Sequence, residues 1–374
     1  MVVLLSSPRL QQTSCFVRAE IIRTMVLPSS PRLQLAAKRL LTSPASSLLP
    51  SSLILDGHDT TNLSAQLQAK GYAPTSQQLI SQEATIIMKD RMDKLFRGEF
   101  ETGIYPDEWH WREGISMPHA AREICNSWKS DRSIAAIVLN EKIGRFISKV
   151  MGWESVRIAQ DDLVWKVPST QQDHTHSRRI DTVGFHQDSA YISNNFEPYD
   201  NNSVTLWIAL DDVDKDSGCL EYAVGSHKWR PLQHRMDDDE VVSSTNKDIS
   251  DFHSSDELSY RKGLSTASQL AGVPGGQIEI DMVPVKEGYA ILHHQDVYHG
   301  SAPNMRSRHR RALVAHYLRG DVSFRQGNGN VPFGGATYIY GRYKRYNSVE
   351  LDETFFPIIY GKKRTEWLDD YIAR

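Results

Sequence analysis

The sequence predicts a mainly β protein, a sandwich or barrel that follows a group of N-terminal α-helices. Short apolar runs recur between residues 157 and 318, and turn residues such as Asp211-Asp212 and Glu287-Gly288 separate them. Helical spacing of apolar residues precedes these runs, between about residues 64 and 151. With 40% hydrophobic and 24% charged residues in a chain of 374, the composition is that of an ordinary globular protein.

The first 50 residues differ from the rest of the chain. They hold six basic residues and a single acidic one, Glu20, and they are rich in serine. An N-terminus of this composition is typical of organelle targeting peptides. We therefore expect a disordered leader over residues 1–55 and a single domain over residues 56–374 of an intracellular protein. The leader is a candidate mitochondrial, plastid or peroxisomal targeting peptide. The alternative is a disordered leader without a targeting signal, on a cytoplasmic protein.

Four segments have helical patterns. Residues 64–70 are followed by Gly71, and residues 77–97 carry apolar side chains spaced for one face. Residues 118–129 and 133–151 are expected to form two further helices. Gly152 is a suitable residue to end the second of them.

Six strands are expected after the helices, over residues 163–167, 203–209, 218–224, 277–282, 289–293 and 311–318. A polar, acid-rich segment interrupts this series, and we interpret it as an insertion at about residues 230–275. A long insertion of this kind is either a lid over a site or a surface excursion.

Charge and cysteine content exclude several functions. The formal net charge is −3, so nothing indicates a nucleic acid partner or a basic membrane-binding helix. No apolar run approaches the roughly 20 residues that span a bilayer. Three widely spaced cysteines predict neither a zinc knuckle nor a disulfide framework and agree with a reducing compartment. We expect a small-molecule substrate, and the oligomeric state is not indicated.

Three residues form a candidate metal site. Residues two apart on a strand point to the same face, so His186 and Asp188 can bind one metal ion while Gln187 points away. His299, at the end of another expected strand, can supply the third ligand. Two imidazoles and one carboxylate with open coordination positions are typical of non-haem iron oxygenases. A zinc hydrolase is the competing interpretation, although no HExxH motif is present.

A second His-x-Asp pair, His294 and Asp296, is the weaker candidate. The histidines that follow it lie too close in the sequence to reach it from a partner strand. His186 and Asp188, in contrast, are separated from His299 by about 110 residues, which is enough for several strands and a return.

An arginine after His299 is the candidate anchor for a cosubstrate. A guanidinium in a cavity forms bidentate hydrogen bonds with a carboxylate, and 2-oxoglutarate offers one beyond the keto-acid end that chelates iron. Arg310 begins the next expected strand and shares a face with Ala312, Val314 and His316. The competing residues are Arg306, Arg308 and Arg311, and strand alternation alone does not choose among the four.

The motifs taken together resemble the phytanoyl-CoA dioxygenase family of Fe(II)- and 2-oxoglutarate-dependent oxygenases. They cover residues 150–320 and occur in this order: Trp165-Lys166-Val167-Pro168, His186-Gln187-Asp188, Trp207, Gly218-Cys219-Leu220, Gly225-Ser226-His227-Lys228, His299-Gly300-Ser301-Ala302-Pro303-Asn304 and Arg310-Arg311-Ala312.

The resemblance implies a double-stranded β-helix, that is, a jelly-roll or cupin-like core flanked by N-terminal helices. It implies that iron is held by His186, Asp188 and His299. It also implies that Arg310, rather than Arg311, binds the carboxylate of 2-oxoglutarate. The positions that match the cosubstrate pocket or its approach are Ser301, Trp207 and Lys166. His227 is expected to belong to a structural turn and not to bind metal.

The resemblance also implies a reaction. Its requirements are Fe(II), 2-oxoglutarate and O2, with ascorbate as a candidate accessory reductant. Asp188 is a carboxylate where halogenating relatives carry a small residue. We therefore expect hydroxylation of an unactivated C–H bond, or a related desaturation or ring reaction, with release of succinate and CO2. The implied substrate is a small organic metabolite: an acyl-CoA, an amino-acid derivative or a specialised metabolite. The alternatives are a non-catalytic binding protein of the same fold and a zinc-dependent hydrolase.

Two segments are candidate substrate contacts. Residues 105–112 are rich in aromatic and charged side chains, although a buried aromatic corner is the simpler explanation. Four basic residues lie just before the expected metal strand, where they can meet an anionic substrate or simply be solvated: His174, His176, Arg178 and Arg179.

Overall fold

The computed structural model describes residues 53–168, 181–229, 261–274, 277–326 and 338–372. All of them belong to one compact unit, Pro44–Arg374. Leu53 and Ile54 are buried and Ile54 pairs with Ile80, so the described fold includes residues before position 56. The rest of the expected leader lies outside the described residues, as do most of the expected insertion and the four basic residues at positions 174, 176, 178 and 179.

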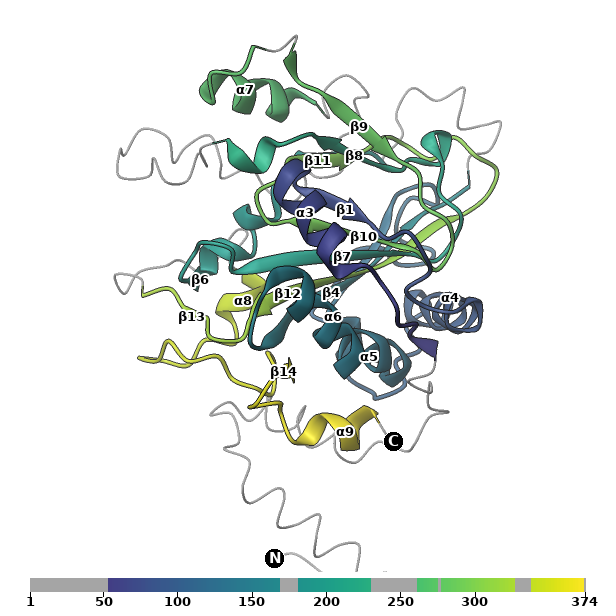
Figure 1. The fold of residues 1–374 in the computed structure, drawn as a ribbon. Coiled ribbons are helices and arrows are strands. Elements are labelled where there is room, and N and C mark those ends of the chain that lie inside the picture. Colours follow the sequence, from purple (N-terminus) through teal and green to yellow (C-terminus); the bar gives the residue numbers. More distant parts are fainter. Residues whose placement is uncertain (1–52, 169–180, 230–260, 275–276, 327–337, 373–374) are drawn as a thin grey trace, which may run out of the picture. The chain divides into compact units, whose positions relative to one another are not determined.

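Eight strands form the core as two antiparallel sheets (Figure 1). The larger sheet contains, side by side, β4 (Val156–Lys166), β12 (Arg310–Arg319), β7 (Ser203–Ala209) and β10 (Ala290–His294). The smaller sheet has the order β5 (Val183–His186), β11 (His299–Ser301), β8 (Leu220–Ala223) and β9 (Ile280–Val283). The chain passes repeatedly from one sheet to the other, and the predicted double-stranded β-helix is therefore confirmed.

Short strands extend the larger sheet. At one edge β1 (Tyr72–Pro74) pairs with β10. At the other edge β3 (Arg122–Cys125) pairs with β4 and is followed by β2 (Glu108–Trp109). β14 (Ile358–Tyr360) also pairs with β4, and β6 (Phe196–Glu197) and β13 (Ser323–Phe324) form a separate two-stranded sheet.

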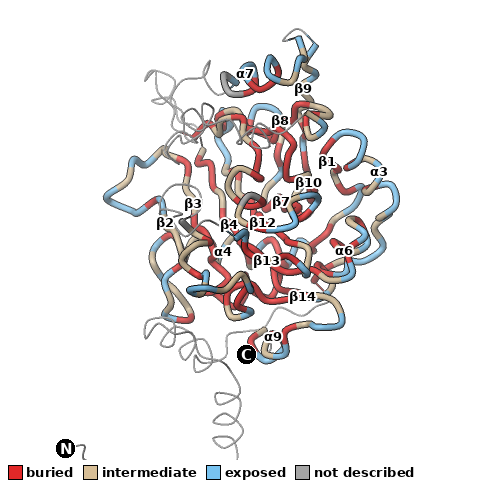
Figure 2. The backbone as a smooth tube through the Cα atoms, turned by 90° about the vertical axis from the view of Figure 1, so that its left-hand side faces the viewer, coloured by how far each residue is buried: buried red, intermediate tan, exposed pale blue. Residues whose placement is uncertain are grey.

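The apolar runs become strands because the space between the sheets buries them. Every residue of β7 is buried. One core cluster joins Trp207 and Val314 of the larger sheet to Leu220 and Tyr222 of the smaller sheet. Branched and aromatic side chains fit such a half-buried pleated surface. Figure 2 shows buried residues along the strands and exposed residues mainly on the outlying helices and turns.

The first two helical patterns are confirmed by α3 (Thr60–Lys70) and α4 (Gln82–Phe96). Side-chain oxygens cap both helices, because Asp59 accepts a hydrogen bond from the amide of Asn62 and Ser81 accepts one from the amide of Ala84. Gly71 ends α3 with a φ of 90°, a conformation that favours glycine.

Two helices, α5 (Arg132–Val138) and α6 (Glu141–Met151), replace the single helix expected over residues 133–151. The side chain of Asn140 explains the break. Its oxygen accepts a hydrogen bond from the amide of Lys142 and caps α6, while its nitrogen donates to the carbonyl of Ala136 in α5. Gly152 ends α6 as expected.

The prediction of a helix over residues 118–129 is wrong. Arg122–Cys125 is β3, and Ser127–Lys129 form one 3-10 turn, η2. Pairing with the buried strand β4 overrides the local helical pattern. Asn126, with a φ of 57°, interrupts the backbone between the two elements.

The described end of the insertion packs on the smaller sheet. Leu264 and Ala267 of α7 (Lys262–Leu270) contact Phe185 and Tyr298, and α7 lies beyond β8 and β9 in Figure 1. This part of the insertion covers a sheet. Near the C-terminus the chain adds α8 (Tyr338–Gly341) and α9 (Trp367–Ile372). Among the described residues, no helix has the length and apolar character needed to cross a membrane.

Candidate functional site

The structure brings His186, Asp188 and His299 together. Nε2 of His186 lies 3.5 Å from Oδ1 of Asp188, and Nε2 of His299 lies 3.6 Å from the same oxygen. The ligand atoms of the three residues all lie within 4.8 Å of one another. Two imidazole nitrogens and one carboxylate oxygen therefore surround a point that a divalent metal ion can occupy, with one side left open.

Two neighbouring strands and a turn place these side chains. His186 ends β5, His299 begins β11, and the two are Cα partners across the antiparallel pair. Asp188 is the first residue of the 3-10 helix η3 (Asp188–Ala190), so the expectation that it shares a strand with His186 is wrong. Gln187 points away, as expected, and its side chain donates to the carbonyl of Asp296.

Backbone carbonyls orient both imidazoles. Nδ1 of His186 lies 2.8 Å from the carbonyl oxygen of Gly184, and Nδ1 of His299 lies 3.1 Å from that of Val297. Since a carbonyl only accepts hydrogen bonds, Nδ1 carries the proton in each ring and Nε2 presents a lone pair. Burial and the neighbouring imidazoles keep the pKa of His299 well below its usual value, so this ring is neutral, as a metal ligand must be.

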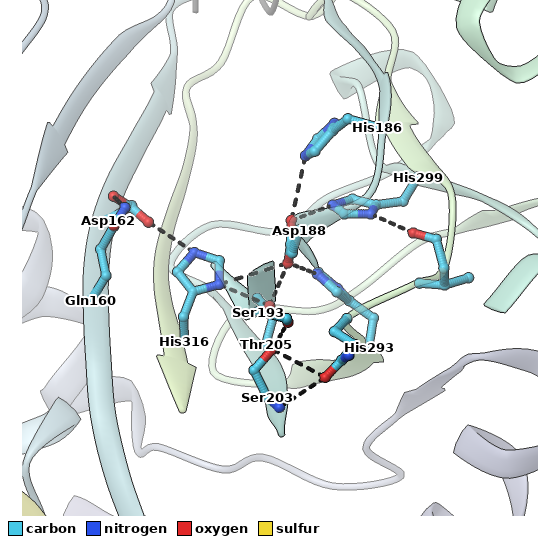
Figure 3. A network of polar contacts seen from close by, with 12 residues as sticks. Gln160, Asp162, His186, Asp188, Ser193, Ser203, Thr205, His293, His299 and His316 are labelled. Atoms are coloured by element: carbon cyan, nitrogen blue, oxygen red, sulfur yellow. Dashed lines mark hydrogen bonds and ion pairs between the residues drawn. The ribbon is translucent and has the colours of Figure 1, made fainter. Parts of the chain in front are cut away.

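The two oxygens of Asp188 have different partners (Figure 3). Oδ1 faces the two histidines, whereas Oδ2 accepts hydrogen bonds from the hydroxyl of Thr205 and from Nε2 of His293, the latter over 2.9 Å. Burial by itself would raise the pKa of Asp188. The facing His299 and the hydrogen-bonding histidines outweigh burial and hold this pKa well below its usual value, so Asp188 is a carboxylate.

A row of polar residues across the larger sheet supports Oδ2. The row consists of Cα partners on five adjacent strands: Tyr72, His293, Thr205, His316 and Gln160. Nδ1 of His316 lies 2.8 Å from the hydroxyl of Thr205, and Nε2 lies 2.9 Å from Oδ2 of Asp162. Burial opposes a charge on His316, but the hydrogen bond to Asp162 and the charge of Asp188 raise its pKa. A protonated His316 donates from both nitrogens, which leaves the Thr205 proton for Asp188.

Thr205, His293 and Asp162 were not among the residues expected at the site. The signal that could have found Thr205 and His293 is a polar side chain within an otherwise apolar strand. Thr205 lies two residues before Trp207 and so shares its face. The predicted face of β12 is confirmed, because Arg310, Val314 and His316 all line the same cavity.

That cavity adjoins the candidate metal ligands and has a volume of about 190 Å³. Arg310, Trp207 and Ser301 line one part of it. The guanidinium carbon of Arg310, a residue only 1% exposed, lies 4.8 Å from the ring centroid of Trp207. Burial lowers the pKa of Arg310 to about 10, so it stays charged at neutral pH. Nε and Nη2 have no hydrogen-bond partner among the described residues, and a bound carboxylate fits these donors.

The competing arginines have other partners. Arg311 forms two hydrogen bonds with Asp211, each 2.9 Å long. Arg306 and Arg308 both pair with Asp214 and are largely exposed. Of these four arginines, Arg310 alone lines the cavity.

Lys166 lies behind Ser301. Its ammonium group donates to the Ser301 hydroxyl over 2.7 Å and to the carbonyls of Ser301 and Ala302 over 3.3 and 2.5 Å. A hydroxyl that accepts from an ammonium group keeps its own proton for another acceptor. Lys166 therefore orients Ser301 towards the cavity and is not itself among the residues lining it.

The rest of the cavity wall comes from β3, β4, α8 and the residue that follows β2. Its residues include His110, Glu123, Cys125, Gln160, Asp162 and Tyr340. The segment at residues 105–112 thus reaches the cavity through His110. Glu123, Cys125 and Asp162 also lie close enough to share a metal ion. However, the oxygens of Asp162 already accept hydrogen bonds from Gln160 and His316.

Two other histidines do not join the site. Nε2 of His227 lies 3.1 Å from the carbonyl oxygen of Gln68, in agreement with a structural turn. Nδ1 of His294 accepts from the backbone amide of Asp296, which closes the turn after β10. Among the described residues, this second His-x-Asp pair belongs to no cluster that could hold a metal ion.

Comparisons with known proteins show a family and a fold that the chain resembles. Residues 68–312 match a family model described as "Phytanoyl-CoA dioxygenase (PhyH)". A probable alpha-ketoglutarate-dependent hypophosphite dioxygenase from Stutzerimonas stutzeri is 27% identical over 201 residues, which cover 53% of this chain and 57% of that protein. A phytanoyl-CoA dioxygenase domain-containing protein 1 homolog from Caenorhabditis elegans is 25% identical over 188 residues, which cover 50% and 55%. The chain thus spans little more than half the length of the curated relatives that it matches.

Solved structures share the fold at low identity. The epimerase SnoN from nogalamycin biosynthesis has a TM-score of 0.55 at 15% identity, covering 80% of this chain and 98% of its own. The carbocyclase SnoK from the same biosynthesis has a TM-score of 0.54 at 17% identity, covering 84% and 99%. EctD from S. alaskensis, with bound Fe, has a TM-score of 0.53 at 12% identity, covering 84% and 91%. These likenesses support the two-sheet topology.

Proposed function

The chain belongs to the phytanoyl-CoA dioxygenase family, and we propose that it is an Fe(II)- and 2-oxoglutarate-dependent dioxygenase. The proposed reaction hydroxylates an unactivated C–H bond of a small organic metabolite, such as an acyl-CoA, an amino-acid derivative or a specialised metabolite, and releases succinate and CO2. One observation carries the proposal: an open-sided His-Asp-His cluster shares a cavity with the buried guanidinium of Arg310, whose Nε and Nη2 have no partner among the described residues.

His186 and His299 would bind the metal through Nε2, and Asp188 through Oδ1. Neutral imidazoles and an ionised carboxylate suit a borderline divalent cation, and the open side leaves room for a chelating cosubstrate. Bound iron would supply the activation of O2. The protein's part is to hold the three ligand atoms apart from water and at fixed distances.

Arg310 would bind the carboxylate of 2-oxoglutarate that is remote from the metal. Two charge-assisted hydrogen bonds from one guanidinium fix both the position and the direction of a carboxylate. The Ser301 hydroxyl, oriented by Lys166, would add a third, and the Trp207 ring would form the adjoining wall. The keto-acid end then points towards the metal ligands, because Arg310 and the triad line the same cavity.

The substrate would enter the remaining part of this cavity, between the triad and the wall that contains His110, Tyr191 and Tyr340. A C–H bond placed there lies next to the open side of the metal. Enclosure of the substrate by the cavity wall would keep bulk water away from the reacting atoms.

A zinc hydrolase and a non-catalytic binding protein remain the alternative functions. A buried guanidinium is costly without a partner, and the remote carboxylate of 2-oxoglutarate would be one, whereas a zinc hydrolase requires no such cosubstrate. A binding protein would have no need for an open coordination side.

The test begins with anaerobic protein loaded with Fe(II) and 2-oxoglutarate, which is then exposed to O2. Succinate should form, and metabolite fractions that contain the substrate should accelerate CO2 release from labelled 2-oxoglutarate. Asp188→Ala should abolish succinate formation, whereas His294→Ala, outside the cluster, should retain it. Full substrate-triggered turnover by Asp188→Ala, or no 2-oxoglutarate binding by the iron-loaded protein, would sink the proposal.

We also propose that residues 1–55 act as a leader that directs the following domain to an organelle. The support is their Arg- and Ser-rich, acid-poor composition. A fluorescent protein fused after residue 55 should localise to mitochondria, plastids or peroxisomes. Diffuse cytoplasmic fluorescence would contradict this role.

A further inference from the structure

A second row of paired residues crosses the smaller sheet and starts at a candidate metal ligand. His299 on β11 lies opposite Tyr222 on β8, and Tyr222 lies opposite Asp281 on β9. On the larger sheet, Tyr72 of β1 lies opposite His293 of β10. Directly opposite residues project to the same face of a sheet, and these side chains meet in the space between the two sheets.

The two tyrosines form a continuous aromatic path from the candidate metal site. The rings of Tyr222 and Tyr72 stack with centroids 4.3 Å apart and planes 10° apart. The Tyr222 ring also lies 5.8 Å from the His299 ring at an angle of 28°. Both tyrosines are fully buried, at 0% and 1% exposure. The short distance between the stacked rings favours rapid electron transfer from one to the other.

Each of these phenols donates its proton to a base. The hydroxyl of Tyr222 lies 2.9 Å from Nδ1 of His293, whose other nitrogen faces Asp188. The hydroxyl of Tyr72 donates to the carboxylate of Asp281. Tyr317 and Tyr371 differ, because they donate to backbone carbonyls, which do not take up protons.

A base matters because it allows a buried phenol to be oxidised. Loss of an electron alone would leave a positive charge in the apolar space between the sheets, at a high cost. Loss of the proton alone would leave a negative charge in the same space, which is also unfavourable. When the electron and the proton leave together, the ring stays neutral throughout.

We propose that Tyr222 and Tyr72 form a relay that carries oxidising equivalents away from the metal site when oxygen activation is not followed by hydroxylation of a substrate. The inference rests on the proposed function, in which bound iron would supply the oxidant. Asp281 is half-buried on β9, the edge strand of the smaller sheet, so the relay ends near solvent.

The electrons and protons balance as follows. One electron passes from Tyr222 to the oxidant at the metal site, and the phenolic proton moves to Nδ1 of His293. Tyr72 then gives an electron to the Tyr222 radical and its proton to Asp281, while His293 returns the first proton to Tyr222. The oxidant has gained one electron, Tyr72 is a neutral phenoxyl radical, and Asp281 is a carboxylic acid. A one-electron reductant of the ascorbate class restores Tyr72, which recovers its proton from Asp281.

Electron paramagnetic resonance of freeze-quenched samples tests the relay. Iron-loaded full-length protein is mixed with 2-oxoglutarate and O2 in the absence of substrate, and separately with hydrogen peroxide, which supplies an oxidant without 2-oxoglutarate. Both samples should show a tyrosyl radical, and deuteration of the tyrosine rings should change its hyperfine structure. Tyr72→Phe should lose the long-lived signal although it keeps the ring stack.

Two further variants sharpen the test. Asp281→Asn keeps an acceptor for the Tyr72 hydroxyl but removes the base, so the signal should fall strongly. Tyr317→Phe, which lacks a buried tyrosine bonded only to a carbonyl, should retain the wild-type signal. During turnover without substrate, Tyr72→Phe should also inactivate several-fold faster than Tyr317→Phe, with more oxidation of side chains around the metal by mass spectrometry.

The experiment distinguishes failure of the tyrosine relay from failure of the proposed oxygenase function. A wild-type signal in Tyr72→Phe, or no tyrosyl radical in either sample, overturns the relay. The Tyr191 ring lies 6.2 Å from the His186 ring. Loss of the signal in Tyr191→Phe instead of Tyr72→Phe would therefore also overturn the relay. Succinate is measured in the same samples: succinate without a radical contradicts the relay, whereas a radical with peroxide and no succinate supports the relay and contradicts the oxygenase.

Discussion

Nε2 of His293 lies 2.9 Å from Oδ2 of Asp188, on the side of the carboxylate opposite to His186 and His299. The Thr205 hydroxyl donates to the same oxygen, which leaves Oδ1 as the oxygen that faces the two imidazoles. A carboxylate held in this way would bind a metal through one oxygen, and so would occupy one coordination position where a chelating carboxylate takes two.

Removal of these donors should weaken metal binding. In His293→Ala and Thr205→Val the carboxylate of Asp188 is free to rotate, and loss of such supporting hydrogen bonds typically costs about 10–100-fold in metal affinity. Anaerobic titration with Fe(II), or with Mn(II) as a stable substitute, measures the change. His294→Ala on the same strand serves as the control, and equal affinities in all three variants would refute the supporting role.

Arg310 should determine the affinity for 2-oxoglutarate. Hydrogen bonds to charged groups contribute roughly 1.5–3 kcal/mol, so Arg310→Met should raise the Kd by about 10–100-fold. Arg310→Lys should fall between, because it keeps the charge and loses the paired donors. Arg311→Met, which removes a bond to Asp211 outside the cavity, should bind 2-oxoglutarate normally. If Arg311→Met showed the larger loss, the assignment of the two residues would have to be exchanged.

Asp161 should make stability depend on pH. Burial raises the pKa of Asp161 to about 7, although its partners Ser127 and Trp128 oppose the shift. The folded protein therefore holds this proton more tightly than the unfolded chain, and the resulting stabilisation is complete below the unfolded pKa near 3.8 and disappears as the pH rises through about 7.

Between these limits, each unit by which the pH rises lowers the free energy of unfolding by up to about 1.4 kcal/mol through this group. Urea denaturation from pH 4.5 to 7.5 measures this slope, and Asp161→Asn, which cannot ionise, should flatten it. An unchanged slope in the variant would mean that Asp161 is ionised in the folded protein.

Gly300 should be intolerant of a side chain. A Cβ at this position would lie 2.8 Å from the carbonyl oxygen of Val183 and 2.9 Å from the Phe185 ring. Gly300→Ala should therefore force β11 away from β5 and separate His299 from His186. We expect a lower Tm and weaker metal binding, measured by thermal unfolding with and without Mn(II). A variant with wild-type values in both measurements would show that β5 can move to accommodate the added methyl group without loss of stability or metal binding.

The three candidate metal ligands could be selected from the sequence, because their residue types and separations are recognisable without coordinates. The supporting row was not, since His293, Thr205 and His316 are far apart in the sequence and only the strand register brings them into line. Choice among the arginines likewise needed tertiary contacts, because both faces of β12 carry apolar residues and Asp211 determines which arginine is turned outward. The strand at residues 122–125 was missed for a related reason, as its conformation is imposed by pairing with β4.

The three candidate ligands belong to the smaller sheet and the turn that follows it, whereas the groups that hold Asp188 belong to β7 and β10 of the larger sheet. Asp188 therefore links the two sheets of the barrel, and a bound cation would strengthen this link. Removal of the metal by a chelator should accordingly speed amide hydrogen exchange in β5 and β11. Exchange in both strands should slow again when the ion is returned.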